Sequence, residues 1–170
     1  MTSKVAFNTA NLVARVTGWR FEMKNWGEQQ KKTVEQTDEK AWAAICHEIA
    51  AAGYQAVEIW VAHVDPAKMT DARAKIYRQI LADNHLRPIG LAGVLTEEHA
   101  RICKLLGIPG CNGGLWGTDL PAVRRVIQTT GVQFNYENHP ETSVPEIVAK
   151  IEGGGIGVAV DTGWLGTKGV

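Results

Sequence analysis

Two stretches near the C-terminus decide how this chain folds: Val132-Gln133-Phe134-Asn135-Tyr136-Glu137 and Ile156-Gly157-Val158-Ala159-Val160-Asp161. Each is a run of strand-forming residues that ends in a carboxylate. In parallel α/β proteins, ligands bind and catalysis occurs at the carboxyl ends of the strands. Oxygen ligands on two successive strands can share one divalent cation, which can polarise a substrate hydroxyl or carbonyl group. The two stretches therefore predict a parallel sheet with Glu137 and Asp161 as metal ligands.

Outward from these stretches, strand-like and helix-like patterns alternate along the whole chain. The expected strands cover residues 4–9, 56–61, 88–94, 111–116, 132–136 and 156–160, and the expected helices begin near residues 37, 66–70, 96, 118–119 and 143. Such alternation requires parallel pairing, right-handed crossovers and helices that cover the sheet. Six strands can form a doubly wound open sheet or part of a (β/α)₈ barrel. Chain length alone favours the open sheet, because barrels typically run to about 250 residues.

Three local expectations accompany this pattern. Residues 15–36 form a long polar stretch, which predicts a functional loop with some structure of its own. In the helix that begins near residue 70, Ala72, Ile76 and Ile80 are expected to share one apolar face. Three further histidines lie in helical segments and are expected to face solvent: His47, His85 and His99.

The composition argues against several classes of function. The 170 residues include 18 basic and 18 acidic side chains, and a net charge of zero gives no basic footprint for nucleic acid or for a membrane surface. No apolar run approaches the roughly 20 residues of a membrane span, and no signal-peptide core opens the chain. The three cysteines lack C-x-x-C spacing and are expected to be reduced thiols. The predicted location is cytoplasmic, with neither a nucleic-acid nor a membrane partner.

Three segments taken together resemble one family: Gly53–Trp60 with His63 nearby, Glu137–His139 and Asp161–Trp164. They are similar to the xylose isomerase-like TIM-barrel superfamily, and more closely to its sugar phosphate isomerase/epimerase branch, which includes inosose dehydratases and tagatose- or psicose-type epimerases. The resemblance covers nearly the whole chain. It implies an α/β fold of the TIM (β/α)₈ type, in which residues 1–170 form a single partial barrel domain with about six βα units present and the last two strands missing.

The resemblance also implies a metal site. In that family a divalent cation, commonly manganese, magnesium or cobalt, lies at the C-terminal mouth of the barrel. Its ligands are a Glu that ends strand five, an Asp that ends strand six, and a His and a Glu from strands seven and eight. Glu137 matches the first ligand and Asp161 the second, while the other two have no counterpart in this sequence.

Four further residues receive a substrate-binding role from the resemblance. Glu58 and His63 match positions that often line the substrate pocket, and His139 is placed to orient Glu137 or to contact substrate. Many relatives have Asp-Thr-Gly-His where this chain has Trp164 in the last position. That change argues against a nuclease-like site with several metals and is compatible with a sugar site that holds one cation.

Each of these residues also has a structural alternative. Asp161 could be the Asx residue of an Asp-Thr-Gly turn, although an acid after an apolar strand is expected to be buried and to need a partner. Glu137 could be a helix-capping or ion-paired acid. His63 and His139 could be solvated loop residues.

The sequence therefore predicts a metal-dependent sugar or sugar-phosphate isomerase or epimerase. Proton abstraction next to a carbonyl, with the cation stabilising the enediolate, would use Glu137 as one of two catalytic carboxylates. The alternatives are an inosose-type dehydratase, which is a lyase, and a non-catalytic incomplete-barrel subunit completed by a partner chain or by a second copy in a homo-oligomer. Residues 166–170 are expected to form a loop that leads into another helix, which favours truncation of a longer protein as the reason for the missing strands.

Overall fold

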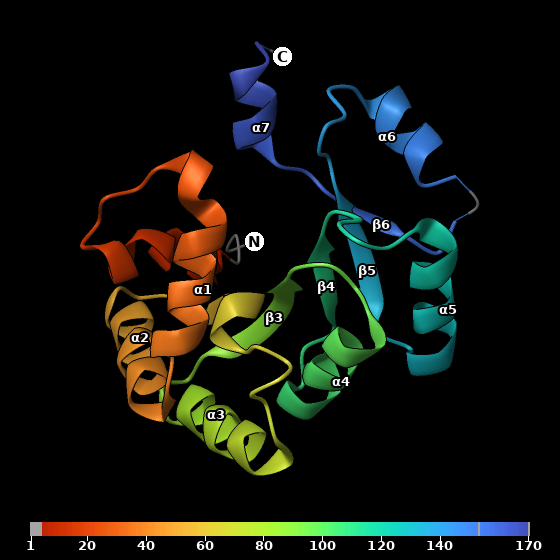
Figure 1. Ribbon diagram of the computed structural model, residues 1–170. Helices are drawn as coiled ribbons and strands as arrows, with labels where there is room; N and C mark the ends of the chain where they lie inside the picture. Colours follow the sequence, from red (N-terminus) through yellow and green to blue (C-terminus); the bar gives the residue numbers. More distant parts are fainter. Residues whose placement is uncertain (1–4, 153, 170) are drawn as a thin grey trace.

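The centre of the protein is one sheet of six parallel strands, seen in a computed structural model that describes residues 5–152 and 154–169 (Figure 1). The strands are β1 (Phe7–Asn8), β2 (Ala56–Trp60), β3 (Arg87–Ala92), β4 (Gly110–Gly113), β5 (Gln133–Glu137) and β6 (Gly157–Ala159). They pair in chain order from β1 to β6, and every pairing is parallel. A doubly wound sheet reverses its strand order at a switch point, and no reversal occurs in the described sheet. The predicted α/β class with an all-parallel sheet is confirmed, and the length argument for a doubly wound sheet is wrong.

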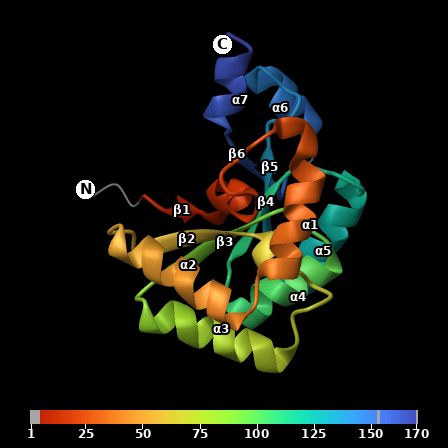
Figure 2. The same ribbon diagram turned by 60° about the vertical axis from the view of Figure 1, so that its left-hand side comes forward.

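Helices alternate with the strands, and α2 to α5 lie around one side of the curved sheet (Figures 1 and 2). The α-helices are α1 (Trp26–Gln36), α2 (Glu39–Ala51), α3 (Asp71–Asp83), α4 (Glu97–Leu106), α5 (Leu120–Thr130), α6 (Val144–Lys150) and α7 (Thr162–Thr167). Three segments are 3-10 helices: η1 (Thr9–Thr17), η2 (Met23–Asn25) and η3 (Val61–His63). Each strand is thus followed by at least one helix, as the alternation in the sequence predicts.

Side-chain caps fix where the helices begin. In six of them the capping oxygen accepts the backbone N–H three residues further on; the caps are Asp38, Thr70, Thr96, Asp119, Ser143 and Asp161. At the other end, Gly107 closes α4 and Gly131 closes α5 with φ of 70° and 74°, a left-handed conformation that suits glycine. The predicted helix starts are therefore confirmed to within two residues.

Residues 15–36 are more regular than a loop, because they include η2 and the whole of α1. Gln29 and Thr33 of α1 are buried although both are polar. The Gln29 amide donates to the Glu22 carbonyl at 3.1 Å, and the Thr33 hydroxyl donates to the Gln29 carbonyl at 2.9 Å. These hydrogen bonds satisfy the Gln29 amide nitrogen and the Thr33 hydroxyl, while the Gln29 side-chain oxygen is buried without a partner.

The apolar core lies between the outer face of the sheet and the helices. Val57 and Ile59 of β2 and Phe134 and Tyr136 of β5 are almost fully buried there. The helices contribute Trp42, Tyr77, Ile102 and Val123 to the same cluster. Side chains alternate between the two faces of a strand, so the residues between these apolar positions point to the inner face, where the candidate site lies.

The apolar face predicted for α3 is wrong by about one residue in helical phase. Ile76 is 47% exposed and Ala72 is also exposed. Of the predicted face only Ile80 packs, partly buried, against the core, and the buried residues of α3 are Ala74, Tyr77 and Leu81. The Tyr77 ring stacks on that of Trp42 in α2, with centroids 5.2 Å apart and an angle of 6° between the planes. The larger apolar area of the stacked aromatic pair sets which side of the helix faces inward.

The C-terminal part differs from expectation in two respects. Val158 and Val160 are exposed, and the Asp161 side chain is 33% exposed, so the prediction that Asp161 is buried is wrong. The cause is the position of β6 at one end of the described sheet, where it pairs only with β5. Residues 166–167 belong to α7 and not to a loop, while Val170, like Lys4 of the first predicted strand, lies outside the described residues.

Two smaller predictions can be compared with the structure directly. Cys46, Cys103 and Cys111 are free and buried, as expected of reduced thiols. In the described part of the chain, none of the helices has the length and apolar character that a membrane crossing needs.

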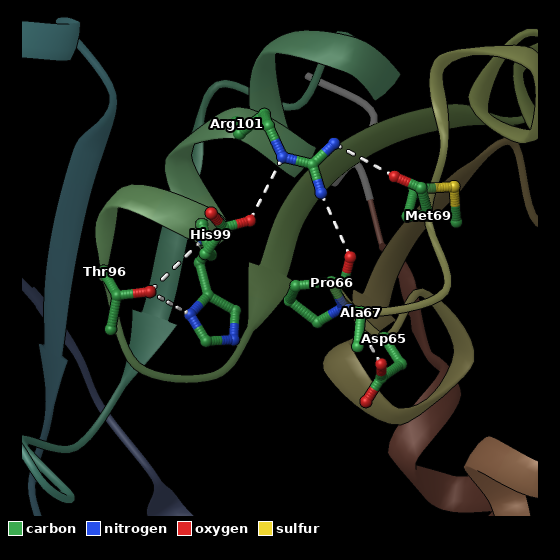
Figure 3. Close-up of polar contacts among 8 residues, drawn as sticks. Asp65, Pro66, Ala67, Met69, Thr96, His99 and Arg101 are labelled. Atoms are coloured by element: carbon green, nitrogen blue, oxygen red, sulfur yellow. Dashed lines mark hydrogen bonds and ion pairs between the residues drawn. The ribbon is translucent and has the colours of Figure 1, made fainter.

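Arg101 of α4 holds the loop between η3 and α3. Its guanidinium donates to the Pro66 and Met69 carbonyls, at 3.0 Å in each case (Figure 3). Its Nε also pairs with the Glu98 carboxylate at 3.1 Å. A single side chain of α4 therefore fixes two points of the loop that leads from β2 and η3 to α3.

His99, two residues before Arg101 in α4, is partly buried and does not face solvent as predicted. Its Nδ1 lies 2.7 Å from the Thr96 hydroxyl (Figure 3). Burial lowers the pKa of His99, although the nearby Asp65 and Glu98 carboxylates oppose the shift. The prediction holds for the other two histidines, since His47 and His85 are exposed.

Candidate metal centre

Glu137, His139 and Asp161 form a compact group where β5 and β6 end. One ligand atom from each lies within 4.8 Å of the others. The closest pair is His139 Nε2 and Asp161 Oδ2, at 3.0 Å. Across residues 5–152 and 154–169, no other group of three His, Cys, Asp or Glu side chains is spaced this closely. The two predicted ligands are therefore adjacent, and His139 joins them.

The spacing and chemistry of the group fit a divalent cation. Two ligands at right angles on an octahedral ion, each about 2.1 Å from it, lie about 3.0 Å apart, and the His139–Asp161 pair has this separation. Two ligands on opposite sides of such an ion lie about 4.2 Å apart. Because all three ligand atoms are within 4.8 Å of one another, a small side-chain rotation is enough to bring them to these distances. A mixed set of carboxylate oxygens and an imidazole nitrogen favours manganese or cobalt over magnesium, which prefers oxygen ligands.

Asn138 holds the ends of β5 and β6 together. Its side-chain oxygen accepts the backbone N–H of Asp161 at 2.6 Å, and its amide nitrogen donates to the Asp161 carbonyl at 3.4 Å. The amide group of the Asn138 side chain thus makes two hydrogen bonds with Asp161, as a backbone peptide group of a neighbouring strand would. These bonds lie just beyond Glu137 and Ala159, the last residues that β5 and β6 pair. Asn138 is fully buried. It fixes Asp161 beside Glu137 without itself offering an atom to a ligand.

Asp161 uses its two carboxylate oxygens for different purposes. Oδ1 accepts the backbone N–H of Trp164 at 3.0 Å and so caps the start of α7. Oδ2 faces His139. The turn-forming alternative for Asp161 is therefore correct for one oxygen, and the other makes a hydrogen bond with His139 that a cation between the two side chains would replace.

Aromatic side chains support the turn that carries His139. The Trp164 ring packs against the imidazole, with centroids 4.8 Å apart. On the outer face, the Tyr136 hydroxyl donates to the Glu141 carboxylate at 2.7 Å and lies 3.0 Å from the His139 carbonyl. Trp164 and Tyr136 thus limit the motion of His139 from two sides. The substrate-binding role predicted for Trp164 stays a prediction, since its ring is already in contact with His139.

The pKa values of the two carboxylates shift in opposite directions. Burial raises the pKa of Glu137, the nearby His139 opposes this, and the Asp161 and Glu58 carboxylates add to the rise. Burial also raises the pKa of Asp161, but hydrogen bonds from the Trp164 N–H and from His139 outweigh it and bring the pKa below its ordinary value. A pair of acids with separated pKa values can hold a proton on one member while the other stays charged.

Glu58 belongs to a chain of hydrogen bonds across the inner face of the sheet, which we call the polar belt: Asn8, Glu58, Asn112 and Asn135. The Asn8 amide donates to Glu58 Oε2 at 2.7 Å, and the Asn112 amide donates to Glu58 Oε1 at 2.5 Å. The Asn135 amide donates to Asn112 Oδ1 at 2.7 Å. All four side chains are half-buried. The predicted substrate-binding residue on β2 is therefore held at both oxygens by asparagines, one from the neighbouring strand β1 and one from β4, two strands away.

Two glycines make room for the polar belt. The Glu58–Asn112 hydrogen bond crosses over β3 at Gly90, where a Cβ atom would lie 2.7 Å from Asn112 Nδ2. A Cβ atom at Gly157 of β6 would collide with the Asn135 side-chain oxygen. The absence of a side chain at these two positions allows polar groups from β2, β4 and β5 to meet across the sheet.

His63 lies apart from the metal group. It is 4% exposed, and its Nδ1 is 3.0 Å from the Thr9 hydroxyl, which accepts the Trp60 N–H at 2.7 Å. The Thr9 hydroxyl has one proton and a second lone pair, so this contact suits a neutral imidazole in either tautomer. Burial, together with the charge of Arg15, lowers the pKa of His63 to about 4. The solvated-loop alternative is wrong, and the predicted contact of His63 with substrate stays a prediction.

Sequence reasoning missed the roles of five residues. His139 is a third candidate ligand, and the Glu-x-His spacing with Glu137 was a usable signal, because a tight turn brings such residues together. The alternation of side chains along a strand could have identified Asn135, since it lies two residues before Glu137 and therefore points to the same face. The roles of Asn8, Asn112 and Asn138 depend on strand register and on a buried side-chain contact, neither of which the sequence specifies.

Comparisons with known proteins provide little beyond this geometry. No protein-family model matches the chain, and no curated protein matches it. Among solved structures, the chain is similar to an adenine deaminase from Arthrobacter aurescens, with 14% sequence identity and a TM-score of 0.49. The likeness covers 93% of this chain and 61% of the deaminase chain. A similarity this distant supports no conclusion about activity.

Proposed function

We propose that this chain is a metal-dependent sugar or sugar-phosphate isomerase or epimerase with the barrel fold of the xylose isomerase-like superfamily. The observation that carries the proposal is the convergence of Glu137, His139 and Asp161 where two neighbouring parallel strands end. The sequential strand order supports the barrel, because a (β/α)₈ barrel winds in one direction from each strand to the next.

The proposed chemistry is removal of a proton from the carbon next to a carbonyl group. A divalent cation held by the three side chains supplies Lewis acidity toward a substrate oxygen. Glu137 accepts the proton at a carboxylate oxygen, a role that its raised pKa suits. Return of the proton to the neighbouring carbon, together with transfer of a proton from the substrate hydroxyl oxygen to the former carbonyl oxygen, completes an isomerisation. Return to the same carbon from the opposite side completes an epimerisation and requires a second acid.

The first experiment measures cation binding by isothermal titration calorimetry with Mn²⁺ and Co²⁺. Wild type is expected to bind one ion, and Glu137→Gln and Asp161→Asn are each expected to weaken binding at least about tenfold, because each removes a charged oxygen ligand. Asp119→Asn is the matched control. Asp119 caps α5 through Oδ1, as Asp161 caps α7, but it lies outside the metal group. Equal binding by wild type and both site variants would overturn the metal assignment.

The second experiment tests the reaction class. In deuterated water, an enzyme that abstracts a proton next to a carbonyl introduces deuterium at that carbon even when net conversion is small. We expect Mn²⁺-dependent exchange with aldoses or ketoses in wild type and none in Glu137→Gln. Cation binding without exchange, across both free and phosphorylated sugars, would leave a metal site but contradict the isomerase chemistry.

A further inference from the structure

We infer that the polar belt is the floor of the proposed active site and that it selects an uncharged polyhydroxylated sugar over the corresponding phosphate ester. This inference rests on the proposed function and narrows its substrate class. It is argued from three features of the inner face: the position of the belt below the metal group, its free hydrogen-bonding groups, and the sign of the charges around it.

The belt lies directly below the metal group on the same face of the sheet. Asn135 and Glu137 are two residues apart on β5, so they point the same way and are separated by about 7 Å along the strand. Asn135 is paired in register with Asn112, which is bonded to Glu58. A ligand whose carbonyl end lies at Glu137 therefore reaches the belt with its other end, and an extended pentose or hexose has a comparable length.

The belt offers donors and acceptors to hydroxyl groups. Each asparagine amide has two N–H groups, and one from each of Asn8, Asn112 and Asn135 is used within the belt. One N–H per asparagine thus remains for a ligand oxygen. Each Glu58 oxygen accepts one belt hydrogen bond and keeps a further lone pair for a hydroxyl donor. The four side chains are half-buried, so part of each remains exposed.

The charges around the belt oppose a phosphate. Among the described residues, neither Glu58 nor Glu137 forms an ion pair with a lysine or arginine, and the ion-pair partner of Asp161 is His139. The asparagine amides that hold Glu58 carry no charge to offset it. A phosphate dianion at the belt would meet the Glu58 carboxylate in a partly desolvated site, where like charges repel more strongly than in water. Phosphate-binding sites of enzymes are instead lined by basic side chains or free backbone N–H groups.

The experiment follows the side-chain NH₂ resonances of Asn8, Asn112 and Asn135 in ¹⁵N-labelled protein, with Mg²⁺ as a diamagnetic cation. Fructose and xylulose, and the phosphate ester of each, are titrated separately. We expect the free sugars to shift the three asparagine signals, and the esters to require about 100-fold higher concentration for the same shift. Glu58→Gln, which keeps the shape and removes the charge, is expected to reduce this preference to less than about tenfold. The backbone spectrum reports whether each variant is folded.

The outcomes separate this inference from the proposed function. Esters that bind as tightly as the free sugars, or asparagine signals that no sugar shifts, would overturn the inference. If Mg²⁺ still shifts the backbone signals of Glu137 and His139 in that case, the metal site stands. Conversely, asparagine signals that respond to sugar in a protein that binds no cation would support the belt and contradict the proposed metal chemistry. An unchanged preference in Glu58→Gln would show that the carboxylate is not the source of selection.

Discussion

The two faces of β5 differ in composition and in what holds them. On the outer face, Phe134 and Tyr136 are each 1% exposed and pack against the helices. On the inner face, Asn135 and Glu137 are half-buried and contact polar side chains of neighbouring strands. Alternation along one strand therefore separates two tasks. The outer residues stabilise the fold by burial, and the inner residues hold one another in position for a ligand.

The largest difference between the faces is expected in stability. Phe134→Ala should lower the free energy of unfolding by about 3–5 kcal/mol, since it removes a buried ring and leaves a cavity. Asn135→Ala, the adjacent residue on the other face, should lower it by about 1 kcal/mol, because it removes one partly solvated hydrogen bond. Urea unfolding of both variants measures the difference. Equal losses would mean that the inner face carries as much of the stability as the outer face.

A second test concerns His63, which is buried, in contrast to His139, which is half-buried beside Asp161. The pKa of His63 falls from 6.5 to about 4 on folding, so the unfolded chain binds a proton more tightly than the folded protein. The stability associated with neutral His63 is therefore fully present above about pH 6.5. It is lost progressively as the pH falls toward about 4, by a total of about 3 kcal/mol.

The measurement is urea unfolding across that pH range for wild type and for His63→Gln, which keeps a hydrogen-bonding side chain beside Thr9 but does not titrate. The variant should show a smaller loss of stability than wild type between neutral pH and pH 4. Since acidic groups titrate in both proteins, the difference between the two profiles isolates His63. Identical profiles would contradict the assignment of a buried neutral imidazole.

Asn138 is expected to affect both stability and cation binding. Asn138→Ala leaves the Asp161 N–H without its buried partner, which should cost about 2 kcal/mol. It should also weaken Mn²⁺ binding about tenfold or more, since Asp161 loses the contact that fixes it beside Glu137. Asn84→Ala is the matched control, because Asn84 bonds a helix carbonyl at 2.8 Å in α3, outside the metal group. A variant that loses stability but binds Mn²⁺ normally would limit Asn138 to a structural role.

The parts of the fold that sequence analysis predicted are those fixed by local chemistry. Capping residues such as Thr96 and Asp119 bond N–H groups three residues away, so their effect is visible in the sequence itself. The phase of α3 was not predictable in this way. Whether Ile76 or Tyr77 faces inward depends on Trp42 of another helix, 35 residues earlier in the chain.

The candidate site was predictable only in part for the same reason. Glu137 and Asp161 each end an apolar stretch, and parallel pairing brings such ends together whatever the details of register. The polar belt depends on the register itself, because Asn112 reaches Glu58 only if a glycine occupies the position between them on β3. A strand shifted by one residue would place Asn112 on the outer face.

The smallest expected effect is the loss of folding stability that the charged Glu137 side chain causes on the inner face when no cation is bound. Its folded-state pKa is raised, chiefly by burial, so the folded protein disfavours the charged form. This contribution favours folding below the ordinary pKa of 4.5 and is lost as the pH rises through the folded value. Glu137→Gln should therefore be slightly more stable than wild type at neutral pH in metal-free buffer, as measured by thermal unfolding.

Addition of Mn²⁺ should reverse that order. A ligand at 100 times its Kd stabilises the folded state by about 2.7 kcal/mol, and wild type should gain this stability while Glu137→Gln gains little. This reversal in the order of stability would show that the Glu137 carboxylate binds the cation and is not simply a buried acid without a ligand. If Glu137 were a buried acid that binds no cation, Glu137→Gln would be more stable than wild type in both buffers. Replacement of a structural acid on the outer face, such as Glu141 beside Tyr136, would instead lower stability in both buffers. Glu141→Gln in the same two buffers is therefore the control that ties the effect to the inner face.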